Sequence, residues 1–322
     1  MSDNTKNGKA FEYACLKEIE DVLKNNNKIV FIKKDDPFRT AEGCFNNLNK
    51  KQSLNYKIAA KRGIQLIQDL EPNLCNGKGD LKLSIASDSI AIGKKGGDVR
   101  DVIAIRNENN PLWEVGISCK HNHEALKHPR ITKDYDFGFE WIGKHCSTQY
   151  FKEITPVMDK ISNLRYSRWN QVPNKKTDYY KPVLNAFKNE LKILCKDSTV
   201  PKKIVSYFFG THDFYKIMMQ EKSRSTTIQG FNINGTLGKS IKGQRSRIPV
   251  PQISLPTKLL QIEFKEPKKN DVSTTLRLTF DKGWVITMRL HNKDSKPKPT
   301  SLAWDVKLEG IPTGMFSTTQ LW

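Results

Sequence analysis

The sequence predicts an α/β fold that ends in an antiparallel β module, and three observations support this prediction. An amphipathic helical pattern begins close to the N-terminus. Short apolar runs with strand character then alternate with helical stretches up to about residue 222. From about Ser223 apolar residues alternate with polar or basic ones, and turn-forming residues separate the segments. A chain of 322 residues is long enough for two parts, which we expect at residues 1–222 and 223–322.

The first expected element is an amphipathic helix at residues 9–24, KAFEYACLKEIEDVLK. Its apolar residues recur at the spacing that places them on one face of an α-helix. This apolar stripe consists of Phe11, Cys15, Ile19 and Val22, and is widened by Leu16 and Leu23. A second helix is expected from about residue 46 to residue 70.

Strands and further helices are expected in the rest of the first part. The strand-like pieces are residues 81–87, 101–106 and 113–120. Helical patterns resume at residues 137–143, 150–164 and 181–195. The apolar run VSYFFG at 205–210 is expected to be a buried strand, and residues 213–222 a short helix.

The last hundred residues have the alternation of half-buried strands. Five segments show it: residues 225–234, 258–266, 273–280, 283–292 and 302–310. Between two of them, Asp281-Lys282-Gly283 has the composition of a hairpin turn. We therefore expect an antiparallel β module with a basic face.

The charge of the chain indicates a polyanionic partner. It has 54 basic and 34 acidic residues, a net charge of +20 and a pI near 9.6. The basic residues are spread along the whole length rather than gathered in a tail, which favours a folded basic groove. Nucleic acid is therefore favoured over a membrane surface, although solubility is the simpler explanation of the charge.

The cysteines and the N-terminus bear on the compartment. The six cysteines have no CxxC spacing, which argues against a zinc ribbon and a disulfide scaffold. The N-terminal residues are polar, and no apolar run approaches the roughly 20 residues of a membrane span. We expect a cytoplasmic protein without a membrane association.

The most informative stretch is residues 97–121, GDVRDVIAIRNENNPLWEVGISCKH. It predicts two strands joined by a turn, with Asp101 at the start of the first strand and Lys120 at the end of the second. If the turn centres on Asn109 and Asn110, Asp101 faces residue 119 or Lys120 across an antiparallel pair. A carboxylate and an ammonium that converge on one phosphate suit a metal-dependent phosphodiesterase. Solvated strand ends are the alternative interpretation.

A second carboxylate supports the catalytic interpretation. Glu12 lies on the first helix at the head of an otherwise apolar line that should face the sheet. Its alternative role is a favourable charge near a helix N-terminus. Glu114 shares a strand face with Lys120 but lies six residues away, roughly 20 Å along the strand. Glu114 is therefore expected to be a distal polar residue.

These motifs resemble those of the HaeIII type of type II restriction endonucleases. The resemblance rests on NGKAFEY, on GDVRD with WEVGISCKHNH, on HPRITKDYDFG and on GWVITMRLHN, and it extends over most of the chain. It implies the PD-(D/E)XK fold, with a mixed central sheet flanked by helices and a C-terminal DNA-recognition module. It also implies Mg²⁺-dependent cleavage of double-stranded DNA at GGCC, with blunt ends between G and C. A cognate DNA methyltransferase is the implied functional partner, and the palindrome allows a homodimer.

The resemblance assigns roles to particular residues. Asp101 and Lys120 match the metal-binding Asp and the catalytic Lys of the superfamily, and Glu12 matches an acid of its first helix. The expected metal ligands are Asp101, Glu12 and the backbone carbonyl of Cys119. The sequence departs from the pattern at Ser118, where the motif usually has an acid. The candidates for a second acidic ligand are Glu12, Asp98, Glu124, Asp134 and Asp136.

DNA contacts are expected mainly in the second part. Guanine edges are best read by Arg or Lys in the major groove. The candidates are Lys239, Lys242, Arg245, Arg247, Arg277 and Arg289. His121 and His123 are further candidates in a loop after Lys120; with Asn122 they spell HNH, but a contiguous tripeptide does not form the site of that nuclease class. For each residue taken alone, a phosphate contact or a solvated loop is the alternative.

Two other functions remain open from the sequence. A repair or recombination nuclease of the same superfamily would read DNA structure rather than sequence. A non-catalytic DNA- or RNA-binding protein would use the same charges to bind phosphates, with a salt-dependent affinity, and would show no cleavage with any metal.

Overall fold

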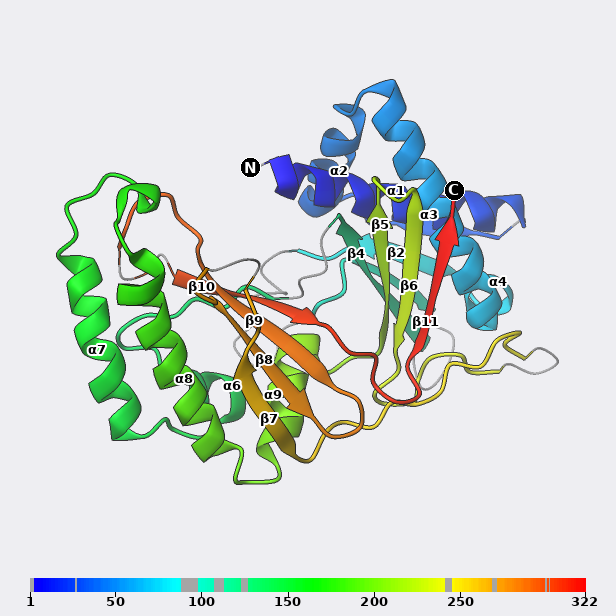
Figure 1. The fold of residues 1–322 in the computed structure, drawn as a ribbon. Helices are drawn as coiled ribbons and strands as arrows, with labels where there is room; N and C mark the ends of the chain where they lie inside the picture. The colour runs from blue at the N-terminus through cyan, green and yellow to red at the C-terminus, as the bar shows by residue number, and fades with distance from the viewer. Residues whose placement is uncertain are drawn as a thin grey trace.

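The computed structural model describes residues 3–26, 28–87, 98–106, 113–122, 127–240, 245–267, 271–298, 300 and 302–322. Two sheets organise the described chain, and each packs against its own group of helices (Figure 1). No described helix is long and apolar enough to cross a bilayer. All six cysteines are free thiols.

The larger sheet has seven strands in the order β1-β2-β3-β4-β5-β6-β11. Their bounds are β1 (Val30–Ile32), β2 (Leu81–Ile85), β3 (Val102–Arg106), β4 (Trp113–His121), β5 (Phe214–Gln220), β6 (Ser225–Phe231) and β11 (Phe316–Leu321). The β1–β2 and β4–β5 pairs are parallel and the other pairs antiparallel, so the sheet is mixed. The expectation of a mixed sheet with flanking helices is thereby confirmed.

The first group of helices packs on this sheet. It comprises α1 (Asp3–Asn25), α2 (Asp36–Asn46), α3 (Lys50–Leu70) and α4 (Pro72–Asn76). The buried stripe of α1, which includes Phe11, Cys15 and Ile19, shares one hydrophobic cluster with Ile117 of β4. Helix α3 begins at residue 50, after an Asn49–Gln52 capping box, rather than at residue 46.

The smaller sheet is antiparallel, in the order β10-β9-β8-β7. Its strands are β7 (Leu259–Phe264), β8 (Thr275–Phe280), β9 (Val285–Asn292) and β10 (Leu302–Leu308). The second group of helices shares its hydrophobic cluster (Figure 1). These helices are α6 (Phe137–Ile142), α7 (Thr148–Ser162), α8 (Lys181–Leu194) and α9 (Val200–Phe209), with the short turns η1 (Trp169–Gln171) and η2 (Lys176–Tyr180).

The β8–β9 hairpin has the turn that its sequence predicts. Lys282 and Gly283, the central residues of the turn, have φ angles of 57° and 79°. Positive φ at both central residues is the signature of a type I′ turn, whose twist matches that of the strands. The expected antiparallel β module is therefore present, although it begins at β7 rather than at Ser223.

Two expected elements are wrong. Residues 205–209 of the expected strand belong to helix α9, in which Ile204, Val205, Phe208 and Phe209 form one buried stripe. Residues 214–220 form strand β5, not a helix. Strand β5 lies inside the larger sheet and is buried along almost its whole length, so its sequence shows no alternation.

Two strands that follow Ser223 join the larger sheet. Strand β6 pairs with β5, and β11 pairs with β6 at the edge. Strands β1 and β11 and helix α2 were not expected from the sequence. The division into a catalytic part (1–222) and a recognition part (223–322) concerns function, and it stays a prediction.

Candidate active site

Strands β3 and β4 place Asp101 beside the residues that end β4. Val102 pairs with Ile117, and the N–H of Asp101 donates to the Ile117 carbonyl at 2.8 Å. If this register is extended by one residue, Ser118 lies across from Asp101. The sequence predicts residue 119 or Lys120 at that position. The expected turn at 109–110 lies outside the described residues. Lys120 nevertheless remains within reach of Asp101.

One oxygen of Asp101 accepts three hydrogen bonds. Its Oδ2 accepts from the Ser118 hydroxyl at 3.3 Å, from the Cys119 N–H at 2.7 Å and from the Lys120 ammonium at 3.1 Å. The Asp101 side chain is 21% exposed. The carboxylate is thus oriented by three donors from one strand, and Oδ1 takes part in none of these bonds.

Glu12 of α1 joins this pair. It is 6% exposed, and its Oε2 accepts from the Lys9 ammonium at 3.0 Å. Burial raises the pKa of Glu12 to about 8, and the negative charge of Asp101 adds to the rise. The cations of Lys9 and Lys120 act in the opposite direction. Two carboxylates therefore repel each other in a buried site that also holds two ammonium groups.

The same charges determine the protonation of Lys120. Burial works to lower its pKa, but the charges of Asp101 and Glu12 outweigh burial, and the pKa rises. Lys120 is therefore an ammonium at neutral pH. It can donate hydrogen bonds and offset negative charge, but it holds its proton too firmly to serve as a base.

The docking of α1 on β4 brings Glu12 to the hairpin. Cys15, one turn after Glu12 on α1, is buried in the same hydrophobic cluster as Cys119 on β4. Burial raises the pKa of the Cys119 thiol, which stays protonated. Because side chains three residues apart lie on one side of a helix, this packing directs Glu12 to the same end of β4.

The sequence interpretation missed Lys9. It lies one turn before Glu12, and its side chain is 11% exposed. An acid and a base three residues apart on a helix are close enough to pair, so the spacing was available as a signal. What the spacing does not reveal is the burial that keeps this pair away from water.

The other candidate acids have different roles. Asp98 and Glu114 both pair with Arg100, at 2.6 and 2.7 Å. Asp136 caps α6 and accepts from the N–H groups of Phe139 and Cys146. Asp134 is exposed, and Glu124 lies outside the described residues. Of these candidates, Glu12 is the one whose pKa responds to the charge of Asp101.

The donor set suits a hard divalent cation. Asp101 and Glu12 offer carboxylate oxygens, and a cation between them would relieve the repulsion that raises the pKa of Glu12. The described residues contain no group of three or more His, Cys, Asp or Glu side chains arranged to hold a metal. Two carboxylates completed by carbonyl, water and phosphate oxygens are typical of Mg²⁺ sites in phosphoryl chemistry.

The expected DNA-contacting residues fall into separate places. Arg277 and Arg289 lie on β8 and β9 of the smaller sheet. Lys239, Arg245 and Arg247 are exposed and belong to the segment between β6 and β7. Arg247 forms an ion pair with Asp69 of α3 at 3.0 Å. Lys242 lies outside the described residues.

His121, the first histidine after Lys120, is less open to DNA than expected. The ring of His121 packs on Tyr56 with centroids 5.1 Å apart, and its Nε2 lies 3.4 Å from Glu221 Oε2. Burial lowers the pKa of His121, which favours the neutral ring. His123 lies outside the described residues.

Comparison with known proteins identifies the family of the chain. The sequence profile of the HaeIII restriction endonuclease family matches residues 8–312. The Type II restriction enzyme HaeIII of Haemophilus aegyptius is 35% identical over 322 residues, which cover 98% of this chain and 97% of that enzyme. The match includes α1 from residue 8 onward, strands β3 and β4 and all of the smaller sheet. The chain therefore belongs to the HaeIII restriction endonuclease family.

Proposed function

We propose that this chain is a type II restriction endonuclease that cleaves double-stranded DNA at GGCC, between G and C, with Mg²⁺ as its cofactor. The observation that carries this proposal is the convergence of Asp101, Lys120 and Glu12 from two strands and a helix. Family membership supports site-specific DNA cleavage, and the resemblance of the motifs to the HaeIII type supports GGCC as the target. The basic surface of the chain suits the polyanionic substrate.

In this proposal each of these residues has its own role in phosphodiester hydrolysis. Asp101 Oδ1 and Glu12 hold the cation, and the Cys119 carbonyl is the proposed third ligand. When bound, Mg²⁺ polarises the phosphate and lowers the pKa of a bound water. Lys120, as an ammonium, donates to the attacking water or to a phosphate oxygen and offsets the charge that develops on phosphorus. Ser118 holds Asp101 in position rather than binding the cation.

The cellular context follows from the family and stays a prediction. We propose a cognate DNA methyltransferase that protects the host sites, a cytoplasmic location and, because GGCC is a palindrome, a homodimer on DNA.

Cleavage of a plasmid with mapped GGCC sites tests this function. The chain with Mg²⁺ should give the fragments that these sites predict, and EDTA should stop the cutting. Asp101→Asn and Lys120→Met should each lower the cleavage rate by about 100-fold or more, because each removes a group that stabilises the transition state. Both variants should still bind the duplex in a gel-shift assay.

Matched substitutions away from the site serve as controls. Asp36→Asn and Lys6→Met change exposed residues of α2 and α1 and should cut at the rate of the parent. Full activity of Asp101→Asn would overturn the site assignment, and cutting in EDTA would overturn the metal proposal. Cutting of branched DNA without preference for GGCC would instead favour a repair or recombination nuclease.

A further inference from the structure

One face of the smaller sheet carries two ordered rows of polar side chains. Thr275, Arg289 and Asp305 are direct neighbours across β8, β9 and β10. The next row on the same face, two residues along each strand, begins with Arg277 on β8. It continues across the sheet with Thr287 and Lys307.

The opposite face of these strands is the hydrophobic one. Leu276, Leu278, Met288, Trp304 and Val306 are at most 1% exposed and belong to the cluster that contains the helices. The alternation of the strands therefore directs Arg277 and Arg289 away from the core. Their side chains are 43% and 56% exposed.

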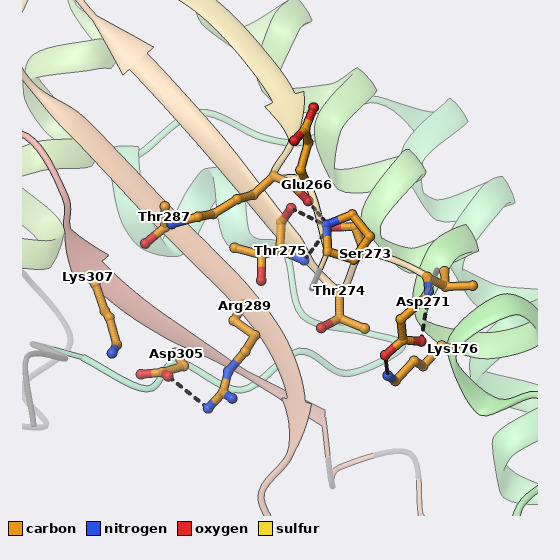
Figure 2. A pocket seen from close by; sticks show the side chains of 13 residues that line it. Lys176, Glu266, Asp271, Ser273, Thr274, Thr275, Thr287, Arg289, Asp305 and Lys307 are labelled. Atoms are coloured by element: carbon orange, nitrogen blue, oxygen red, sulfur yellow. Dashed lines mark hydrogen bonds and ion pairs between the residues drawn. The ribbon is translucent and has the colours of Figure 1, made fainter. Parts of the chain in front are cut away.

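A cleft of about 540 Å³ lies over this polar face (Figure 2). Four hydroxyl-bearing residues line it together with charged ones. The lining includes Ser273, Thr274, Thr275, Thr287, Arg289 and Lys307. Figure 2 shows the guanidinium of Arg289 directed at Asp305, with Lys307 beside them.

Each arginine lies beside a carboxylate: Arg289 is hydrogen-bonded to Asp305 of β10, and Arg277 forms an ion pair with Glu309 just after β10. Arg289 Nη2 donates to Asp305 Oδ2 at 3.0 Å, and the Asp305 side chain is 4% exposed. Arg277 Nε lies 3.3 Å from Glu309 Oε2, and Lys265 pairs with the other oxygen of Glu309. A buried acid that holds one edge of an exposed guanidinium restricts its orientation and leaves the other N–H groups available.

The charge of the cleft argues against a phosphate ligand. Its lining contains four basic and three acidic residues, a small excess in a chain of net charge +20. Each carboxylate beside the cations repels a phosphate and weakens their attraction for it. Oriented arginines among hydroxyl groups instead suit a neutral ligand edge that is rich in hydrogen-bond acceptors. Guanine presents such an edge, O6 and N7, in the major groove.

We propose that this cleft binds the major-groove edge of guanine in the DNA target, with Arg289 as the reading residue and Asp305 as its positioning residue. Arg277 and Glu309 form the equivalent pair in the second row. This inference rests on the proposed function and deepens it, since GGCC presents guanines on both strands. Sheets are known to read the major groove in other DNA-binding proteins.

Binding in EDTA, where the proposed cleavage stops, tests the cleft with the intact chain. Affinity is measured by fluorescence anisotropy for a GGCC duplex, for the same duplex with 7-deazaguanine, and for an unrelated duplex. Because 7-deazaguanine lacks the N7 acceptor, it should weaken binding about tenfold, within the roughly 5- to 150-fold worth of one bidentate contact. Unchanged affinity for the modified duplex would overturn the proposal without any variant.

The variant Arg289→Lys locates the contact. It keeps the charge but loses the fork of donors, so it should weaken GGCC binding about tenfold and leave the unrelated duplex unchanged. The losses from Arg289→Lys and from 7-deazaguanine should not multiply, because both remove the same contact. Multiplying losses, or equal losses on both duplexes, would contradict the assignment. Arg39→Lys, which alters an ion-paired arginine on α2, should change neither affinity.

Asp305→Asn tests the positioning role. Since the Asp305 side chain is buried, the variant should lower the ratio of GGCC affinity to unrelated-duplex affinity without weakening the latter. A purely structural role would lower both affinities together. Failure of this inference and failure of the proposed function can be told apart: if the parent cuts at GGCC but the ratio is unchanged, the cleft is wrong and the enzyme assignment stands.

Discussion

At the scale of single residues, Asp101 is a strand-end carboxylate whose orientation is fixed by its neighbours on β4. Three donors of β4 bind one oxygen of its carboxylate and leave the other oxygen for a ligand. The negative charge of Glu12 acts on Lys120 through space, since it contributes to the raised pKa of Lys120. The chemistry of the site thus depends on the mutual electrostatics of three residues.

Glu71 is a second buried acid, distant in role from the active site. It is fully buried at the end of α3, and its Oε1 accepts from Tyr215 OH at 2.7 Å and from the Gly238 N–H at 2.6 Å. Burial raises its pKa to about 7. The two hydrogen bonds act in the opposite direction without cancelling the effect of burial. Glu71 therefore joins the helices, β5 and the segment that leads to Lys239.

The raised pKa of Glu71 predicts a pH dependence of stability. The folded chain binds this proton more tightly than the unfolded chain, so the contribution is fully present below pH 4.5 and is lost as the pH rises to about 7. The shift corresponds to about 3 kcal/mol. Urea unfolding at several pH values should show this loss in the parent, and Glu71→Gln should remove most of it. An identical pH profile for parent and variant would contradict this account.

At the scale of elements, the β3–β4 hairpin depends on a close approach that only glycine permits. A Cβ at Gly116 would lie 1.9 Å from Cδ of Arg100, whose side chain covers that face of β4. Arg100 is 5% exposed and pairs with both Asp98 and Glu114. The residue immediately before Asp101 is thereby locked over the sheet.

Gly116→Ala should therefore displace Arg100 and disturb Asp101. We expect a loss of about 1–3 kcal/mol in the free energy of unfolding, as for other overpacked sites, together with slower DNA cleavage. Gly43→Ala is the matched control: a Cβ there meets nothing within 4 Å, and alanine in a helix should stabilise by up to about 1 kcal/mol. Thermal unfolding and cleavage rates measure both effects, and equal behaviour of the two variants would contradict the role of Arg100.

At the scale of the whole molecule, the chain links the active site directly to the smaller sheet. After β4 ends at His121, the segment from Lys127 to Arg130 forms bridges with β10. The backbone also bonds from Ile131 N to Leu302 O and from Trp304 N to Pro129 O. The strand that carries Lys120 is thus continuous with a segment bound to the sheet that carries Arg289.

The net charge predicts a strong effect of salt on DNA binding. Neutralised phosphates release counterions, so the logarithm of the affinity should fall linearly with the logarithm of the salt concentration. With roughly 6 to 10 phosphate contacts, affinity for an unrelated duplex should fall by about 10³–10⁵ between about 50 and 200 mM salt. Anisotropy titrations in EDTA measure this slope. Binding that is independent of salt would show that the +20 charge does not contact the DNA backbone.

The sequence predicts correctly those elements that depend on residues close together in the chain, and fails for those that depend on distant partners. The β8–β9 hairpin and the amphipathic α1 depend on neighbours in the chain, and both were expected. Residues 205–210 and 213–222 were assigned to the wrong kind of element, because short apolar runs fit a buried helix or a buried strand equally well. The strand character of β5 comes from its two partners, β4 and β6, on either side.

The sequence by itself determined the charge of the molecule and the chemical ends of one hairpin, Asp101 and Lys120, since a hairpin brings nearby residues together. The sequence pointed to Glu12 as well, but its meeting with them depends on the tertiary packing of α1 on β4, where Cys15 and Cys119 share one hydrophobic cluster. Only the tertiary structure decided which partner holds Arg289, since register between strands is set by the burial of one sheet face. The spacing of apolar residues in the sequence shows which face of a helix or strand is buried, but only the folded chain shows which other element packs on that face.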